Sequence, residues 1–158
     1  MFFPLYIDLR NKEVLIVGGG KLSLRKAEKL KEYGASLTIF SKNIKEKKLN
    51  EIEDIKFISE NLENDNEKIE ELIKQYFLII AATDDIELND NIARVCMKNN
   101  ILVNNVSSKT EMNAMFGATV KNDEFNVAVS TNGKNCKRSR ALKLKIKNLL
   151  NEIDSLSS

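Results

Sequence analysis

Residues 14–30 read VLIVGGGKLSLRKAEKL, an apolar run that ends in three glycines and continues into a helix-like stretch closed by Gly34. The order strand, glycine turn, helix is typical of a dinucleotide-binding unit, because glycine lets the backbone approach a pyrophosphate and the helix N-terminus offers unpaired N–H groups. Gly18 and Gly20 take the first two positions of the G-x-G-x-x-G spacing, and Ser23 takes the third. The stretch predicts a dinucleotide site, with a tight turn that binds no ligand as the alternative.

Strand-like and helix-like segments alternate over the first two thirds of the chain. The segments expected as strands span 12–19, 35–40, 55–59, 76–82 and 101–106. The segments expected as helices span 22–34, 41–54, 64–75 and 86–100. This alternation predicts an α/β fold with a Rossmann-like, doubly wound parallel sheet.

The pattern changes after residue 112. Two segments with alternating apolar residues, within 113–121 and 124–130, predict an antiparallel hairpin with a short turn at 121–123. A last helix is expected over 135–153, with an apolar stripe formed by Leu142, Ile146, Leu149, Leu150 and Ile153. We therefore divide the chain into a dinucleotide-binding domain, 1–112, and an appended hairpin with a basic helix, 113–158, that is suited to a subunit interface.

The composition excludes several classes of protein. The chain has 158 residues, of which 42% are hydrophobic and 30% charged, as in a soluble globular protein. No apolar run approaches the roughly 20 residues that span a bilayer, and the N-terminal MFFPLYIDLR does not resemble a signal peptide. We expect a cytoplasmic protein with no membrane partner and with Cys96 and Cys136 as free thiols. Because the sequence has no histidine, a histidine-based metal site or triad is impossible, and we predict no bound metal.

The basic residues concentrate at the C-terminus. From Lys134 onward, seven Lys or Arg and two acids give a net charge of +5, so the first 133 residues carry −3 in a chain with +2 overall. The tail is either a solvated helix face or a patch for an acidic ligand. Since no aromatic residues interleave its charges, we expect no nucleic-acid partner.

Polar residues follow the second and fourth predicted strands. The second strand ends in Phe40-Ser41-Lys42-Asn43, without the acid that usually holds the ribose of NAD. Ser41 and Asn43 can bond a ribose and Lys42 can accept a 2′-phosphate, so these residues leave NAD and NADP open. Thr83 follows the fourth strand where a cofactor would pass, and the adjacent aspartates, 84–85, are interpreted as N-cap candidates for the next helix.

Four segments together resemble one family. They are FPLYIDLRNKEVLIVGGGKLSLRKAEKL (3–30), AATDDIELNDNIA (81–93), ILVNNV (101–106) and MFGATVKNDEFNVAVSTNGK (115–134). They are similar to the precorrin-2 dehydrogenase (sirohydrochlorin-forming) domain of siroheme synthases. The family's further C-terminal helical segment has no counterpart in these 158 residues.

The resemblance implies an NAD-dependent oxidoreductase that converts precorrin-2 to sirohydrochlorin in siroheme or cobalamin biosynthesis, within porphyrin biosynthesis. It implies a homodimer, with the C-terminal hairpin and helix as the dimerisation region. It also implies a tetrapyrrole substrate with eight carboxylates, which gives the basic tail an acidic ligand.

The turn, the strand ends and the resemblance together predict the site residues. The predicted cofactor-binding residues are Gly18, Gly19, Gly20, Lys21, Leu22, Ser41, Lys42, Asn43, Thr83 and Asn104. The predicted substrate-binding residues are Asn105, Ser108, Ser130, Thr131, Lys134 and Arg138. Simple turns are the alternative for the serine and threonine positions.

Ser107 is the predicted catalytic position and the main departure, because the resemblance places an aspartate there, proposed to act in dehydrogenation and chelation. A serine is compatible with dehydrogenation, since positioning the two rings supplies much of the rate and water can take the proton. Iron insertion requires the removal of two pyrrole protons, so we predict against ferrochelatase activity. The alternative function is a non-catalytic tetrapyrrole- or nucleotide-binding homologue that has lost the aspartate.

Overall fold

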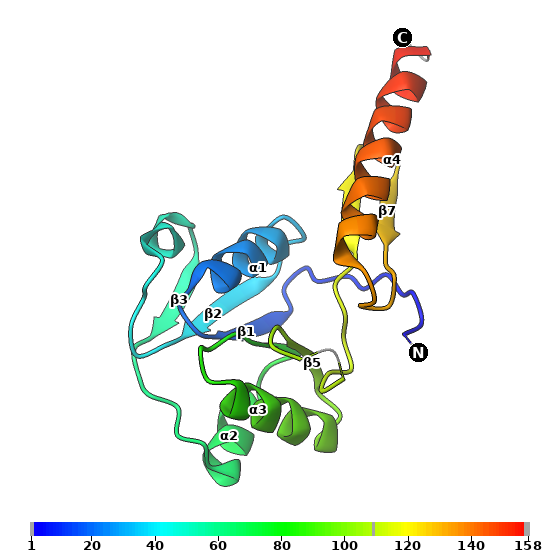
Figure 1. The fold of residues 1–158 in the computed structure, drawn as a ribbon. Coiled ribbons are helices and arrows are strands. Elements are labelled where there is room, and N and C mark those ends of the chain that lie inside the picture. The colour runs from blue at the N-terminus through cyan, green and yellow to red at the C-terminus, as the bar shows by residue number, and fades with distance from the viewer. Residues whose placement is uncertain (1, 109, 157–158) are drawn as a thin grey trace. The chain divides into compact units, whose positions relative to one another are not determined.

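The computed structural model describes residues 2–108 and 110–156, with side chains up to residue 153. The chain forms two compact units, a large one over Phe3–Ala114 and a small one that contains Phe2 and the segment from Met115 onward (Figure 1). Each unit has its own secondary structure.

The large unit is built on a five-stranded parallel sheet. Its strands are β1 (Glu13–Val17), β2 (Ser36–Phe40), β3 (Ile55–Ile58), β4 (Leu78–Ala81) and β5 (Leu102–Asn105), in the order β3-β2-β1-β4-β5. Val17 pairs with Phe40 on one side and Ala81 on the other, so the carboxyl ends of β1, β2 and β4 meet at one edge. The strand order reverses at β1, and open α/β sheets bind their ligands in the crevice at such a point.

Helices cover both faces of this sheet (Figure 1). They are α1 (Lys21–Lys31), α2 (Asn66–Ile73) and α3 (Ile86–Lys98), and a short 3₁₀ helix, η1, spans Lys47–Glu51. A core cluster joins α2 and α3 to one face of β1, β4 and β5, with Leu15, Ile79 and Ile92 fully buried. Cys96 is part of this cluster, and burial raises the pKa of its thiol to about 12. Both cysteines are free, as predicted.

The crossover helix predicted over 41–54 is wrong, because only η1 is helical there. The N–H groups of Lys45 and Glu46 both donate to the carbonyl of Gly19, at 2.9 Å each. This segment therefore bonds to the glycine turn instead of to its own preceding turn. Leu49 in η1 is fully buried and anchors the segment.

The small unit contains the predicted hairpin and helix. Strands β6 (Ala118–Lys121) and β7 (Asn126–Val129) pair antiparallel, and α4 (Cys136–Leu156) packs against them (Figure 1). The turn spans 122–125 instead of the predicted 121–123, and the Asn122 side chain closes it by accepting from the N–H of Phe125. The Rossmann-like fold with an appended hairpin and helix is confirmed.

The apolar stripe predicted on α4 divides into two parts. Leu150 is buried, whereas Leu142 and Leu149 are 48% and 53% exposed. Ser139 takes a buried place beside the hairpin that the apolar pattern does not predict. Among the described helices, none has the length and apolar character needed to cross a membrane.

Candidate functional site

A cleft of about 170 Å³ opens at the carboxyl ends of β1, β2 and β4. Its walls come from the turn after β1, the loop after β2 and the loop after β4. The lining residues are Val17, Gly18, Gly19, Gly20, Phe40, Ser41, Lys42, Asn43, Lys45, Ala82, Thr83 and Asp84. The cleft therefore lies at the switch point of the sheet, where the glycine turn predicts a dinucleotide.

The three glycines of the turn have different surroundings. Gly18 has φ +124°, and a Cβ there would lie 2.2 Å from the carbonyl oxygen of Ala82. A Cβ on Gly19 would lie 2.7 Å from the carbonyl oxygen of Asn43. A Cβ on Gly20 would meet nothing within 4 Å. Gly18 and Gly19 let the neighbouring loops pack against the turn, and Gly20 leaves open space for a ligand.

Helix α1 has Gly20 as its N-cap residue, so it has no side-chain cap, and it has no acid in its first turn. Among the described residues, each of the helices α2, α3 and α4 has a capping side chain, from Asp65, Asp85 and Asn135 respectively. Uncapped N–H groups and the positive end of the helix dipole favour an anion at this position. The start of α1 and the open space at Gly20 together fit the pyrophosphate of a dinucleotide.

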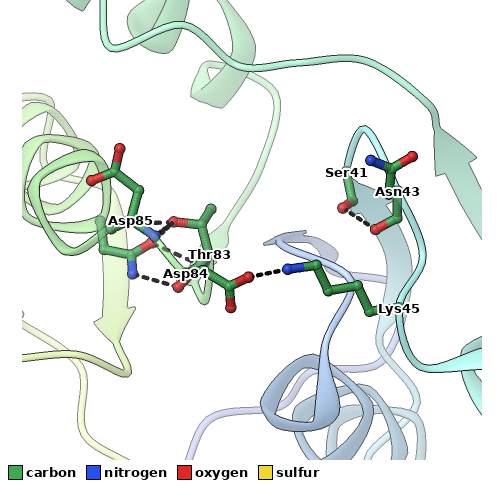
Figure 2. Close-up of polar contacts among 7 residues, drawn as sticks. Ser41, Asn43, Lys45, Thr83, Asp84 and Asp85 are labelled. Carbon is green, nitrogen blue, oxygen red and sulfur yellow. Dashed lines mark hydrogen bonds and ion pairs between the residues drawn. The ribbon is translucent and has the colours of Figure 1, made fainter.

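An ion pair joins the loops on the two sides of the cleft. Figure 2 shows Lys45, from the loop after β2, pointing toward Asp84, from the loop after β4, and the two side chains form a salt bridge. Ser41 donates its hydroxyl to the carbonyl of Asn43, at 2.9 Å, which shapes the loop after β2 (Figure 2). A cation therefore lies at the wall where phosphates would enter, with a carboxylate beside it.

Thr83 is fixed by hydrogen bonds at the end of β4. Its main-chain N–H and its hydroxyl both donate to Asn89 Oδ1, at 3.0 and 2.8 Å. Asp85 caps α3 by accepting from the N–H of Leu88, at 3.0 Å. The N-cap interpretation thus holds for Asp85, whereas Asp84 pairs across the cleft with Lys45.

Ser107 lies just beyond β5 with an exposed side chain. Its hydroxyl accepts from Asn89 Nδ2 at 2.8 Å, and its main-chain N–H donates to Asn105 Oδ1 at 2.9 Å. Asn105 is buried and donates through Nδ2 to Asp90 at 2.7 Å. The amide of Asn105 therefore bonds within the protein and is 1% exposed, and its contact with substrate stays a prediction.

Asn104 is also buried beneath the surface of β5. It accepts from Lys26 Nζ at 2.7 Å and donates to the carbonyl of Ala114 at 2.9 Å. Burial, helped by the charge of Arg25, lowers the pKa of Lys26 to about 8. The half-buried side chain of Lys26 thus reaches from α1 to β5.

The remaining predicted residues lie outside the cleft. Lys21 and Leu22 are exposed in the first turn of α1, next to Gly20. Ser108 accepts from the N–H groups of Thr110 and Glu111 in a local turn. The other predicted substrate-binding residues, Ser130, Thr131, Lys134 and Arg138, belong to the small unit.

In the small unit, two hydroxyls have local structural partners. Ser130 accepts from the N–H of Asn132 at 3.0 Å, and Thr131 accepts from that of Asn135 at 2.8 Å. Lys134 and Arg138 are exposed. Their part in substrate binding stays a prediction.

The cleft brings together seven of the ten predicted cofactor residues: Gly18, Gly19, Gly20, Ser41, Lys42, Asn43 and Thr83. Sequence reasoning missed Lys45 and the buried amide of Asn89. Asn89 had a detectable signal, because it shares one helix face with Ile92, Ala93 and Cys96, at spacings of three, four and seven. Lys45 had none, since its partner is 39 residues away.

Residues 5–118 match the protein family described as "Putative NAD(P)-binding". The chain belongs to this NAD(P)-binding family. The match spans the whole large-unit sheet and the three loops that line the cleft. No three His, Cys, Asp or Glu side chains within 2–108 and 110–153 gather as ligands for a metal ion.

The chain is also similar to proteins of siroheme biosynthesis. Siroheme synthase of Actinobacillus succinogenes is 32% identical over 151 residues, and siroheme synthase 1 of Pectobacterium atrosepticum is 30% identical over 151 residues. Each alignment covers 94% of this chain and 30% of the relative, so the chain spans under a third of their length. The solved structure of "SirC, precorrin-2 dehydrogenase" superimposes with a TM-score of 0.76 and 25% identity, over 93% of this chain and 70% of that one. The resemblance drawn from the four sequence segments is confirmed.

Proposed function

We propose that this protein is an NAD-dependent dehydrogenase that oxidises precorrin-2 to sirohydrochlorin. The observation that carries the proposal is the cleft at Gly20, where the uncapped start of α1 faces open space. The similarity to siroheme synthases over 94% of the chain supports the substrate. A coarser statement, an oxidoreductase of siroheme biosynthesis with a nicotinamide cofactor, follows from the same relatives.

The residues of the cleft fit a dinucleotide. Gly20 and the N–H groups that follow it, at Lys21 and Leu22, would hold the pyrophosphate, and Ser41 and Asn43 would face a ribose. The salt bridge to Asp84 neutralises Lys45, but Lys42 also lines the cleft, so the choice of NAD over NADP rests on the family resemblance. When bound, the cofactor supplies the acceptor for a hydride.

The oxidation removes one hydride and one proton from the substrate. The protein's task is to hold substrate and cofactor against each other, and such positioning can lower a barrier by several kcal/mol. Ser107 follows β5 at the position where the family resemblance implies an aspartate, so we assign the released proton to water. Without a histidine or that acid, we propose that the activity stops at dehydrogenation and does not include iron insertion.

A second function is supported by the same serine. A protein that keeps the cleft and lacks an acidic group at position 107 can bind a tetrapyrrole or a nucleotide without turnover. Positioned general bases contribute about 10²–10⁴-fold to rate, so loss of the acid can reduce an enzyme to a binding protein. The two functions differ in turnover and agree in cofactor binding.

The experiment is anaerobic turnover of precorrin-2 with NAD⁺, followed by sirohydrochlorin absorbance, with calorimetric titration of NAD⁺ in parallel. Wild type and Ser107→Asp are compared. Turnover by wild type supports the dehydrogenase. Binding of NAD⁺ with turnover only in Ser107→Asp supports the binding protein, and absence of NAD⁺ binding in both contradicts the proposal.

A further inference from the structure

Asn89 lies in the first turn of α3, is fully buried, and bonds to two loops at once. Its Oδ1 accepts from the N–H and the hydroxyl of Thr83, and its Nδ2 donates to the carbonyl of Thr83 at 3.0 Å and to Ser107 Oγ at 2.8 Å. An amide side chain offers two donors and two acceptor sites. Asn89 therefore uses its whole hydrogen-bonding capacity to join the end of β4 to the segment after β5.

The orientation of this amide is fixed by its main-chain partners. The N–H of Thr83 can only donate, so it must face Oδ1, and the carbonyl of Thr83 can only accept, so it must face Nδ2. A flip of the amide would oppose like groups at both contacts. Ser107 Oγ faces Nδ2 and must accept its hydrogen bond.

This bond determines what the Ser107 hydroxyl can do. Because Oγ accepts from Asn89, its own hydrogen points elsewhere, and no residue within 2–108 or 110–153 accepts a hydrogen bond from it. The main-chain N–H of Ser107 is held by Asn105, which is oriented in turn by Asp90. Two buried amides thus hold an exposed hydroxyl group with its hydrogen available to a ligand.

We propose that Asn89 is a positioning residue that makes Ser107 a hydrogen-bond donor to a carboxylate of the bound tetrapyrrole, and not a proton acceptor. This inference rests on the proposed function. A hydroxyl that already accepts a hydrogen bond is a poorer base, whereas a donor aimed at a carboxylate forms a strong, charge-assisted bond. The serine then recognises substrate at the place where the family resemblance implies an aspartate.

The test measures the Kd of sirohydrochlorin by absorbance and the KM and kcat for precorrin-2. Hydrogen bonds to charged groups contribute about 1.5–3 kcal/mol, so Ser107→Ala is expected to raise Kd and KM by about tenfold or more, with kcat changed less. Ser107→Thr keeps a hydroxyl and is expected to restore binding. Ser107→Asp is expected to weaken binding further, because its carboxylate repels that of the ligand.

The action of Asn89 through Ser107 is tested by a double-variant cycle. Asn89→Asp can accept from Thr83 but has no amide donor for Ser107, so it is expected to raise Kd in the wild-type background and to add little in the Ser107→Ala background. If the fold changes in Kd of the two single variants multiply in the double variant, Asn89 acts independently of Ser107 and the positioning role is overturned. If Asn89→Asp does not fold, the three Ser107 variants still decide the donor role, and unchanged binding in Ser107→Ala overturns it.

These outcomes separate the inference from the proposed function. If wild-type protein binds sirohydrochlorin with the expected dependence on Ser107 but shows no turnover, the proposed dehydrogenase activity is contradicted and the donor role of Ser107 is supported. If turnover occurs but neither Kd nor KM depends on Ser107, the donor role is contradicted and the dehydrogenase activity is supported. Wild-type protein that binds no sirohydrochlorin contradicts both.

Discussion

Gly18 and Gly20 are two residues apart in one turn and differ in what a side chain would meet. In Gly18→Ala the methyl group collides with the backbone of Ala82, at a φ that L-residues rarely adopt, so we expect the variant to lose about 2 kcal/mol or more of stability. In Gly20→Ala the methyl group enters open space, and we expect the free energy of unfolding to fall by less than about 1 kcal/mol. Because the methyl group blocks the approach of the pyrophosphate, we expect NAD⁺ affinity to fall at least about fivefold. Urea unfolding and calorimetry measure the two effects. Wild-type NAD⁺ affinity in Gly20→Ala would contradict the assigned site.

Lys26 gives the protein a specific dependence on pH. Burial lowers its pKa to about 8 in the folded state, so above that pH the unfolded chain binds a proton that the folded chain has lost. The free energy of unfolding contributed by Lys26 therefore rises with pH, and below pH 8 the cost of burying the charge is present in full. Between about pH 7.5 and 9.5, we expect the free energy of unfolding of wild type to rise by about 1 to 2 kcal/mol relative to that of Lys26→Met.

The measurement is urea unfolding of both proteins at the two pH values. The raised pKa of Cys96 acts in the opposite direction, because the unfolded thiol ionises first. Because Cys96 is present in both wild type and Lys26→Met, its contribution cancels in the difference between their free energies of unfolding. A difference that does not change with pH means that Lys26 titrates equally in both states.

At the scale of elements, the cleft depends on loops that sequence periodicity does not describe. The salt bridge between Lys45 and Asp84 connects the loops after β2 and β4. We expect Asp84→Asn to tighten NAD⁺ binding severalfold, because it removes a negative charge near the pyrophosphate and frees Lys45, and Lys45→Met to weaken it. Since both side chains are exposed, added salt should reduce both effects.

A matched control is available on α2. Lys68 forms a similar exposed pair with Glu63, and neither residue lines the cleft. Lys68→Met should leave NAD⁺ affinity unchanged, as measured by calorimetry. If it weakens binding as much as Lys45→Met, the effect is one of net charge and Lys45 has no local role.

The regular elements were predictable because their apolar periodicity reflects burial, as in β4, where all four residues are buried. The irregular structure of 41–54 was not predictable, since the N–H groups of Lys45 and Glu46 bond to Gly19, a residue distant in sequence. The glycine turn could be placed from sequence, but the separate roles of Gly18 and Gly20 depend on which neighbouring loop approaches each one. The polar residues of β5 could be found but not their roles, because Asn104 and Asn105 are set by partners on α1 and α3.

At the scale of the whole molecule, the two units carry different parts of the proposed function. Every residue that lines the cleft belongs to the large unit. The small unit presents Leu142 and Leu149 to solvent on α4, seven residues apart and so on one helix face. We propose that this face joins two copies of the chain, as the family resemblance implies, because exposed leucines in a row are typical of an interface.

The double variant Leu142→Glu/Leu149→Glu tests this assembly. We expect light scattering after gel filtration to give twice the chain mass of 17.9 kDa for wild type and the single mass for the variant, because charges on an apolar interface are costly to bury. NAD⁺ affinity should remain within about twofold of wild type, since an interface variant outside the cleft leaves its contacts intact. Lys145→Glu, an exposed change on the same helix, is the control for altered charge and should leave the mass unchanged. A monomeric wild type, or a double variant that stays dimeric, would show that α4 does not join two copies through these leucines.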